Sequence, residues 1–229
     1  MNSTLHFIEQ GQGVPLILLH GNGENCNYFQ HQMDAFSRHF RVIALDTRGH
    51  GASPRGGAPF TLEQFSLDLL HFMDEKGIEK AHLLGFSDGG NIALLFALQH
   101  PRRVGRLILN GANLFPGGVK KTVQLPIVAA YHLLRLVCIF DKKALPKREL
   151  LSLMVTQPHI EPAQLKALSM PVLVIAGTRD MIKRSHTRAI ASACPQATLV
   201  LLKGNHFIAA KESKAFNAAV LSFLQEQSP

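Results

Sequence analysis

The sequence predicts an α/β fold in which helices cover a mostly parallel sheet. Short apolar runs alternate with segments of helical periodicity along most of the 229 residues. Glycine-rich turns follow several of these runs, as is typical where a buried strand leaves a sheet. Residues 112–168 break the alternation, which indicates an insertion between two strands.

Seven short apolar runs are the predicted strands. They are residues 5–8, 15–19, 41–45, 81–84, 104–109, 171–176 and 198–202. The first ends at a turn at residues 11–13, and the second runs into residues 20–23, His-Gly-Asn-Gly. The third ends at Asp46, before a glycine-rich loop. Apolar runs bounded by such turns are typical of buried strands.

Helices are predicted between the strands, at residues 28–37, 61–77, 91–99 and 213–225. The second has the clearest start, because Thr61 is followed by Glu63 and Gln64 in a capping pattern. The third helix stops before His100 and Pro101, since proline cannot continue a helix.

The insertion divides the chain into a core of residues 1–111 and 169–229 and a helical cap of residues 112–168. The cap opens with a Phe-Pro-Gly-Gly segment at residues 115–118. Three helical segments follow, at residues 123–140, 147–156 and 161–168. We expect this cap to lie over a site on the core.

The composition is that of a globular domain, with 46% hydrophobic and 17% charged residues. The N-terminus shows no secretory signal pattern, and no uninterrupted apolar run reaches about 18 residues, so we expect no stable membrane insertion. Cys26, Cys138 and Cys194 are odd in number and show no metal-ligand spacing. A reducing, cytoplasmic location without a metal fits this pattern.

The formal net charge of +8 raises the question of nucleic-acid binding. The basic residues are spread along the chain, and no basic and aromatic segment resembles a nucleic-acid module. We therefore expect no nucleic-acid partner. A positive surface would still attract anionic substrates or membrane surfaces.

Residues 85–89, Gly-Phe-Ser-Asp-Gly, fit the pattern G-x-S-x-G between a predicted strand and a predicted helix. Such a turn holds its central residue in a strained conformation with the side chain at the tip. A Cβ on Gly85 or Gly89 would collide with the neighbouring strand or helix. This context predicts that Ser87 is a nucleophile.

A serine nucleophile needs a base, and the base needs an orienting acid. Asp180 lies in the loop after the strand at residues 171–176, and His206 follows the strand at residues 198–202. Parallel strands would bring both side chains to the carboxyl edge of the sheet, beside Ser87. The end of the strand at residues 104–109 offers only amides, Asn110 and Asn113, so Asp180 is the predicted acid.

The oxyanion of a tetrahedral intermediate needs two N–H donors. The backbone N–H of Asp88, directly after the nucleophile, is one predicted donor. We assign the other to the backbone N–H of Asn22, in the loop after the second strand. Eight other histidines are predicted to be surface or capping residues: His31, His39, His71, His82, His100, His132, His159 and His186.

These motifs resemble those of the α/β-hydrolase superfamily, in the branch of single-domain esterases, C–C bond hydrolases and cofactor-free haloperoxidase-like enzymes. The resemblance rests on five segments in the same order, at residues 20–23, 46–53, 85–90, 177–180 and 204–206. It implies an eight-stranded, mostly parallel sheet with a cap. The short N-terminal portion indicates that the first of these strands is missing or merged, leaving about seven or eight. Ser87 argues against haloalkane dehalogenases and epoxide hydrolases, whose nucleophile is an aspartate.

The cap is expected to select the substrate. Its first helix offers an apolar wall for an acyl group, made of Ile127, Val128, Tyr131, Leu134, Leu136, Val137 and Phe140. Gly21, Cys26 and Phe86 are further candidates for the pocket lining. Basic residues in the cap suggest an anionic or amphiphilic ester.

The leading hypothesis for function is a serine hydrolase that cleaves a small carboxylic ester through an acyl-enzyme, without cofactor or metal. A second hypothesis keeps the triad but cleaves a carbon–carbon bond in an acidic, diketone-like substrate. A third is a hydrolase-fold protein that binds a ligand with little turnover. The sequence leaves the acyl group and the oligomeric state open.

Overall fold

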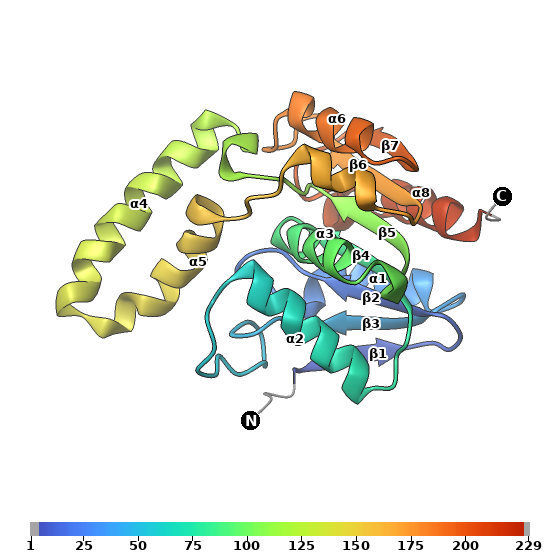
Figure 1. Ribbon diagram of the computed structural model, residues 1–229, viewed down its shortest axis with the longest axis horizontal. Helices are drawn as coiled ribbons and strands as arrows, with labels where there is room; N and C mark the ends of the chain where they lie inside the picture. The colour runs from blue at the N-terminus through green and yellow to red at the C-terminus, as the bar shows by residue number, and fades with distance from the viewer. Residues whose placement is uncertain (1–4, 227–229) are drawn as a thin grey trace.

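The computed structural model describes residues 5–226, and its centre is one seven-stranded sheet in the order β1-β3-β2-β4-β5-β6-β7 (Figure 1). The strands are β1 (Phe7–Gln10), β2 (Pro15–Leu19), β3 (Arg41–Leu45), β4 (Ala81–Phe86), β5 (Val104–Asn110), β6 (Val172–Gly177) and β7 (Ala197–Leu202). All pairs are parallel except β1 with β3. The predicted α/β fold with about seven strands is confirmed.

The first strand begins two residues later than predicted. β1 pairs antiparallel with β3, with Phe7 opposite Leu45 and Gln10 opposite Val42. It is an edge strand, so its last residues can be polar and still pair with β3. A search for apolar runs does not detect such polar strand residues. Leu5 precedes the strand and is buried in the core.

Helices cover both faces of the sheet. The α-helices are α1 (Gln30–Phe36), α2 (Leu62–Glu75), α3 (Asp88–Gln99), α4 (Lys121–Phe140), α5 (Leu145–Thr156), α6 (Arg184–Ala193), α7 (Ile208–Lys211) and α8 (Ser213–Gln225). Short 3-10 helices are η1 (Cys26–Phe29), η2 (Pro101–Arg103), η3 (Pro116–Gly118), η4 (Lys142–Ala144) and η5 (Pro162–Ala167). The last helical segment of the cap is therefore a 3-10 helix.

The two faces of the sheet carry separate hydrophobic clusters. Alternate residues of one strand point to opposite faces, so Ile17 belongs to the cluster that includes residues of α2, α3 and α6, while Leu16 belongs to the cluster that includes residues of α1 and α8. α6 has no counterpart among the predicted helices. The Thr61 cap is confirmed, because its side chain accepts a hydrogen bond from the backbone N–H of Gln64 at 3.1 Å.

Most of the cap extends away from the sheet and the helices that cover it (Figure 1). α4 and α5 form an antiparallel hairpin that projects from one end of the molecule, with η4 at its tip (Figure 1). We call the segment Lys121–Thr156 the arm. Among residues 5–226, α4 is the one helix that is long and apolar enough to cross a membrane by length and composition.

Candidate active site

Ser87 sits between β4 and α3 with φ 53° and ψ −119°. It is the one non-glycine residue with a positive φ within residues 5–226. Its N–H donates to the carbonyl of Asn110 at 2.8 Å, and its own carbonyl accepts from the N–H of Asn91 at 3.1 Å. The neighbouring strand and the first turn of α3 therefore hold the strained backbone in place.

The two flanking glycines are required by close backbone contacts. A Cβ on Gly85 would lie 2.1 Å from the carbonyl oxygen of Gly89. A Cβ on Gly89 would lie 2.0 Å from the carbonyl oxygen of Leu19. The collision expected from the sequence is thus present on both sides of Ser87.

Asp180 and His206 meet as the sequence predicts. Asp180 follows β6, His206 follows β7, and the imidazole Nδ1 lies 2.7 Å from Oδ1 of Asp180. Both side chains are buried. The same Oδ1 also accepts the backbone N–H of Ile182 at 2.9 Å, which fixes the carboxylate.

This hydrogen bond assigns the histidine tautomer. When Nδ1–H donates to the carboxylate, Nε2 is left as the acceptor, and within the described chain Nε2 is buried without a partner. An unpartnered imidazole nitrogen is the atom that accepts a proton from a serine hydroxyl.

Close contacts place the imidazole beside the nucleophile turn. A Cβ on Gly111, next to the Asn110 that binds Ser87, would lie 2.7 Å from Cε1 of His206. The rings of Phe86 and His206 have centroids 4.8 Å apart. Among the three predicted side chains, the hydrogen bond within residues 5–226 is the one between His206 and Asp180.

The two predicted oxyanion donors are linked through their side chains. Nδ2 of Asn22 donates to Oδ2 of Asp88 and to the carbonyl of Leu150 on α5, both at 2.9 Å. Within the described residues, neither backbone N–H has an acceptor in the protein. Asp88 is also the first residue of α3, where the helix dipole favours an anion.

His20 supports the loop that carries Asn22. Its Nδ1 bonds the carbonyl of Gly21 at 2.7 Å, and its Nε2 accepts the N–H of Thr47 at 3.1 Å. Burial, and to a lesser extent the nearby His50, lowers the pKa of His20 to about 4. The ring is therefore neutral at pH 7, and its hydrogen bonds hold the loop in place.

Two side chains near the triad were missed by the sequence reasoning. The carboxylate of Glu24 accepts the N–H of Gly21 at 3.2 Å, and burial raises the pKa of Glu24 to about 7. Tyr28 stacks on Phe86 with ring centroids 4.4 Å apart, and its hydroxyl is buried without a partner in the described chain. Burial raises the pKa of Tyr28. Neither residue belongs to a motif, and only their closeness in sequence to the Asn22 loop was a signal.

The candidate pocket residues fall into different environments. Gly21 and Phe86 lie together beside the triad, since a Cβ on Gly21 would be 3.0 Å from the ring of Phe86. Cys26 is buried in the core cluster under α1 and α8, and like Cys138 and Cys194 it is a free thiol. Ile127 and Tyr131 are half-buried on α4.

Several other expectations need correction. Leu136, Val137 and Phe140 do not form a sheltered wall, because they are 61%, 37% and 90% exposed on α4. The surface assignment is wrong for His186, which is buried and accepts the N–H of Leu114 at 2.9 Å. His186 thereby ties α6 to the start of the cap.

One cluster has the composition of a metal site. The ligand atoms of His6, Cys26 and Asp46 lie within 4.8 Å of one another. Both oxygens of Asp46 already accept hydrogen bonds, from His6, from the N–H of Cys26 and from the N–H of Ala52. Burial also raises the pKa of the Cys26 thiol to about 11, which disfavours the thiolate. These contacts hold the loop after β3 in place.

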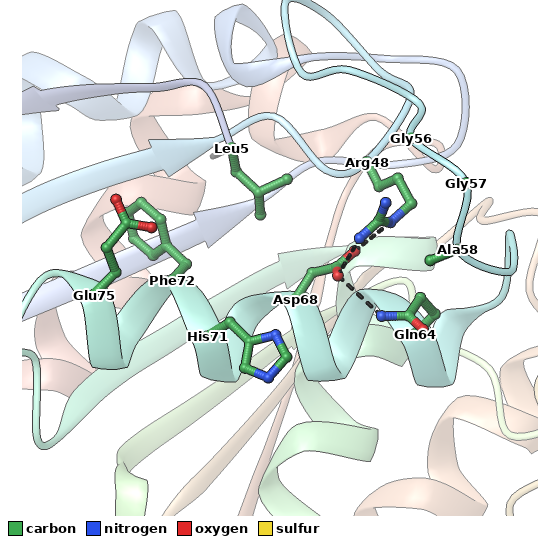
Figure 2. A pocket seen from close by; sticks show the side chains of 10 residues that line it. All are labelled: Leu5, Arg48, Gly56, Gly57, Ala58, Gln64, Asp68, His71, Phe72 and Glu75. Carbon is green, nitrogen blue, oxygen red and sulfur yellow. Dashed lines mark hydrogen bonds and ion pairs between the residues drawn. The ribbon is translucent and has the colours of Figure 1, made fainter. Parts of the chain in front are cut away.

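A separate cavity of about 160 Å³ lies between α2 and the loop at residues 56–58 (Figure 2). Nε and Nη2 of Arg48 donate to the two carboxylate oxygens of Asp68 at 2.7 and 2.5 Å. Gln64 donates to the same carboxylate. The cavity contains none of the triad residues, and its buried cation is already paired.

The family comparison agrees with this geometry. Residues 14–135 match the family model described as the alpha/beta hydrolase fold. The chain belongs to this family. The family assignment and the site geometry make this chain a hydrolase.

Individual relatives of this hydrolase cover most of its length. It is 29% identical over 245 residues to a protein of Caulobacter sp. (strain K31) whose name assigns it to carbamate hydrolysis, covering 93% of this chain and 91% of the relative. A hydrolase structure from Pseudomonas aeruginosa PA01 is 30% identical with a TM-score of 0.77, covering 97% of this chain and 94% of the other. An enol-lactonase structure from Burkholderia xenovorans LB400 is 25% identical with a TM-score of 0.82, at 97% and 96% coverage.

Proposed function

We propose that this hydrolase cleaves small carboxylic esters through an acyl-enzyme on Ser87. The observation that carries the proposal is the 2.7 Å bond from Asp180 to Nδ1 of His206, which leaves Nε2 as an unpartnered acceptor beside the strained Ser87 turn. The enol-lactonase of similar fold supports the choice of bond, because a lactone is a cyclic ester.

The chemistry follows from these positions. Oγ of Ser87 attacks the ester carbonyl carbon while its proton passes to Nε2 of His206. The backbone N–H groups of Asn22 and Asp88 hold the oxyanion. Collapse of the intermediate expels the alcohol, which takes the proton from His206. Water then attacks the acyl-enzyme and gives its proton to Nε2 of His206. Collapse of this second intermediate breaks the bond between Oγ of Ser87 and the acyl group, Oγ takes the proton back from His206, and the carboxylic acid leaves.

Groups of both charge signs lie near Ser87. The carboxyl group of Glu24 lies against the oxyanion loop, and Nζ of Lys120 donates to the backbone carbonyl of Asp180. The basic pair Lys142 and Lys143 lies farther away, at the arm tip (Figure 1). An anionic or amphiphilic ester remains the prediction from the cap composition.

The test is turnover of p-nitrophenyl esters, from acetate to decanoate, by the wild type and Ser87→Ala. The variant should lose on the order of 10⁶-fold in kcat, as in a comparable triad. A wild type that turns over none of the series contradicts the proposal. In that case, labelling of Ser87 by a fluorophosphonate would indicate an enzyme that cleaves another kind of bond. Absence of labelling would indicate a ligand-binding protein with an inactive site.

C–C bond hydrolysis is the second candidate. The chain is 37% identical over 128 residues to a 2-hydroxy-6-oxononadienedioate/2-hydroxy-6-oxononatrienedioate hydrolase of Paraburkholderia phymatum, covering 53% of this chain and 44% of that protein. Loss of the dienoate absorbance on mixing such a substrate with the wild type, but not with Ser87→Ala, would favour this reaction.

A further inference from the structure

The outer face of α4 exposes large apolar side chains without a partner in the described chain, with the exposed His132 among them. From Leu133 to Phe140 they recur at spacings of three or four residues, and Leu125 precedes them by about two helical turns, so they share one side of the helix. They are Leu125 at 65%, Leu133 at 62%, Leu136 at 61%, Ile139 at 65% and Phe140 at 90% exposed. Contiguous exposed apolar surface of this kind marks an interaction site.

The opposite side of the same helix explains why this face is free. Ile127, Tyr131, Leu134 and Cys138 recur at the complementary spacing and are half-buried or buried. α4 packs against α5 within the arm. α5 therefore covers the inner side of α4. The outer apolar residues lie on the side away from α5.

Positive charge surrounds the apolar face. Residues 120–148 contain seven basic residues and one acidic residue, Asp141. Five of these cations are exposed and belong to no ion pair within residues 5–226: Lys121, Arg135, Lys142, Lys143 and Lys147. An occupant of this face must therefore offer both an apolar and an anionic surface.

We propose that the outer face of α4 and the tip of the arm dock on a lipid bilayer that carries anionic headgroups. Phe140 and Ile139 enter the boundary between headgroups and acyl chains, while Lys142 and Lys143 contact the headgroups. Apolar anchoring combined with cationic attraction is the signature of a helix that lies in the interface.

A second copy of the chain fits the same face less well. α4 itself contains no acidic residue, and lysines flank both of its ends. An antiparallel two-fold pairing would bring Lys120 and Lys121 of one copy toward Asp141, Lys142 and Lys143 of the other, so the net interaction at each end is between like charges and costs more as the apolar contact excludes water.

The arm geometry favours lying on the bilayer over spanning it. α4 is about 30 Å long, but α5 returns to the core with only 12 residues, which include Lys147, Arg148 and Glu149. Such a short, charged helix cannot cross back through about 30 Å of hydrocarbon. The N-terminal half of α5 is also held to the core, by the ion pair of Glu149 with Arg55 at 2.5 Å.

The test is co-sedimentation of the full chain with vesicles of phosphatidylcholine alone and of phosphatidylcholine with one third phosphatidylglycerol. The wild type should sediment with the anionic vesicles, and added salt should weaken the binding. Phe140→Ser should reduce the partition coefficient at least tenfold, since a buried phenyl ring contributes about 1.5–3 kcal/mol. Lys142→Gln with Lys143→Gln should reduce it roughly 30-fold, at about 1 kcal/mol per charge.

Matched variants separate this surface from general stickiness. Leu67→Ser removes an apolar side chain that is 40% exposed on α2, and Lys80→Gln with Lys214→Gln removes two exposed charges outside the arm. Both should keep wild-type binding. Thermal unfolding of every variant shows that the fold is retained.

Three outcomes overturn the proposal. In the first, the wild type does not bind anionic vesicles and remains monomeric. The face would then be assigned to an acidic protein partner. Another is a wild type that ignores vesicles but forms a dimer that Phe140→Ser dissolves, which assigns the face to a second copy. The last is binding that Phe140→Ser and the lysine pair leave unchanged. All readouts are of binding, so they are independent of the proposed ester hydrolysis.

Discussion

Asn22 and Asp88, whose backbone N–H groups are the expected oxyanion donors, are bonded to each other through their side chains at 2.9 Å. The loop after β2 and the nucleophile turn after β4 are thus joined at the point where the two donors must converge. This amide–carboxylate contact and the second bond of Asn22, to Leu150, add to the support that His20 and Glu24 give the loop.

Asn22→Ala tests this link. The backbone donor remains, so the variant should lose roughly tenfold in kcat, less than the 10²–10³ typical of deleting a donor outright, with little change in KM. Steady-state kinetics on the best p-nitrophenyl ester measure the split. Asn27→Ala, an exposed amide on η1, is the control. A rise in KM with unchanged kcat would assign Asn22 to substrate binding instead.

The glycines of the nucleophile turn differ sharply from an open glycine elsewhere. Gly89→Ala would place a Cβ 2.0 Å from a backbone oxygen, so we expect a loss of stability of about 4 kcal/mol or more, or failure to fold. Gly57→Ala meets nothing within 4 Å and should leave the melting temperature nearly unchanged. Thermal unfolding checks both. Comparable melting temperatures for the two variants would contradict the close approach of β2 and α3.

The buried ion pair of Arg48 with Asp68 should matter far more than the exposed pair of Arg41 with Glu9. Asp68→Asn leaves the guanidinium buried without a counter-charge, which should cost roughly 3–5 kcal/mol. Glu9→Gln breaks a pair whose side chains are about one-third exposed and should cost about 1 kcal/mol or less. Chemical denaturation measures both. Equal losses would show that burial does not set the strength of these pairs.

Glu24 should give the protein a distinctive dependence of stability on pH. Its pKa is raised to about 7 in the folded state from 4.5, so between these values the folded state binds more protons than the unfolded state. Stability from this group therefore falls as pH rises from about 4.5 to 7 and then stays constant. Glu24→Gln should remove that fall, so the melting temperature of the variant relative to the wild type should increase across this window.

Glu9→Gln is the contrasting variant in the same melting experiments. Arg41 holds the pKa of Glu9 below its usual value, so the stability that Glu9 contributes is present above pH 4.5 and is lost in acid. Relative to the wild type, Glu9→Gln should therefore lose stability as pH rises toward 4.5, whereas Glu24→Gln should gain stability as pH rises from about 4.5 to 7. Differences that do not change with pH would contradict the buried state of Glu24.

The sequence could predict that Ser87, Asp180 and His206 lie at the same edge of the sheet, because chain order and strand ends carry the necessary geometry. Ser87, Asp180 and His206 each follow a parallel strand, and all such strands end at one edge. α6 escaped prediction because its buried positions include His186 and Thr187, which hide the apolar period. Glu24 and Tyr28 escaped because their roles arise from packing against residues distant in sequence, such as Phe86.

The arm shows the same limit for a long element. The sequence predicts α4 from its helical periodicity. It also predicts that the apolar residues of α4 form a wall over the site, because apolar residues usually face a core. Which side of the helix α5 occupies depends on the direction in which the hairpin leaves the core, and no local pattern encodes that direction. The exposure of Leu136 and Phe140 could therefore be known only from the structure.

The arm contacts the core along α5, through Glu149 with Arg55 and through the carbonyl of Leu150 with Asn22, while Phe140 and η4 lie at its tip (Figure 1). A substitution at the tip does not have to be accommodated by the sheet. Under the proposal above, the docking surface can therefore change without a change at Ser87, and grafting the arm tip onto a relative would transfer membrane docking without the reaction.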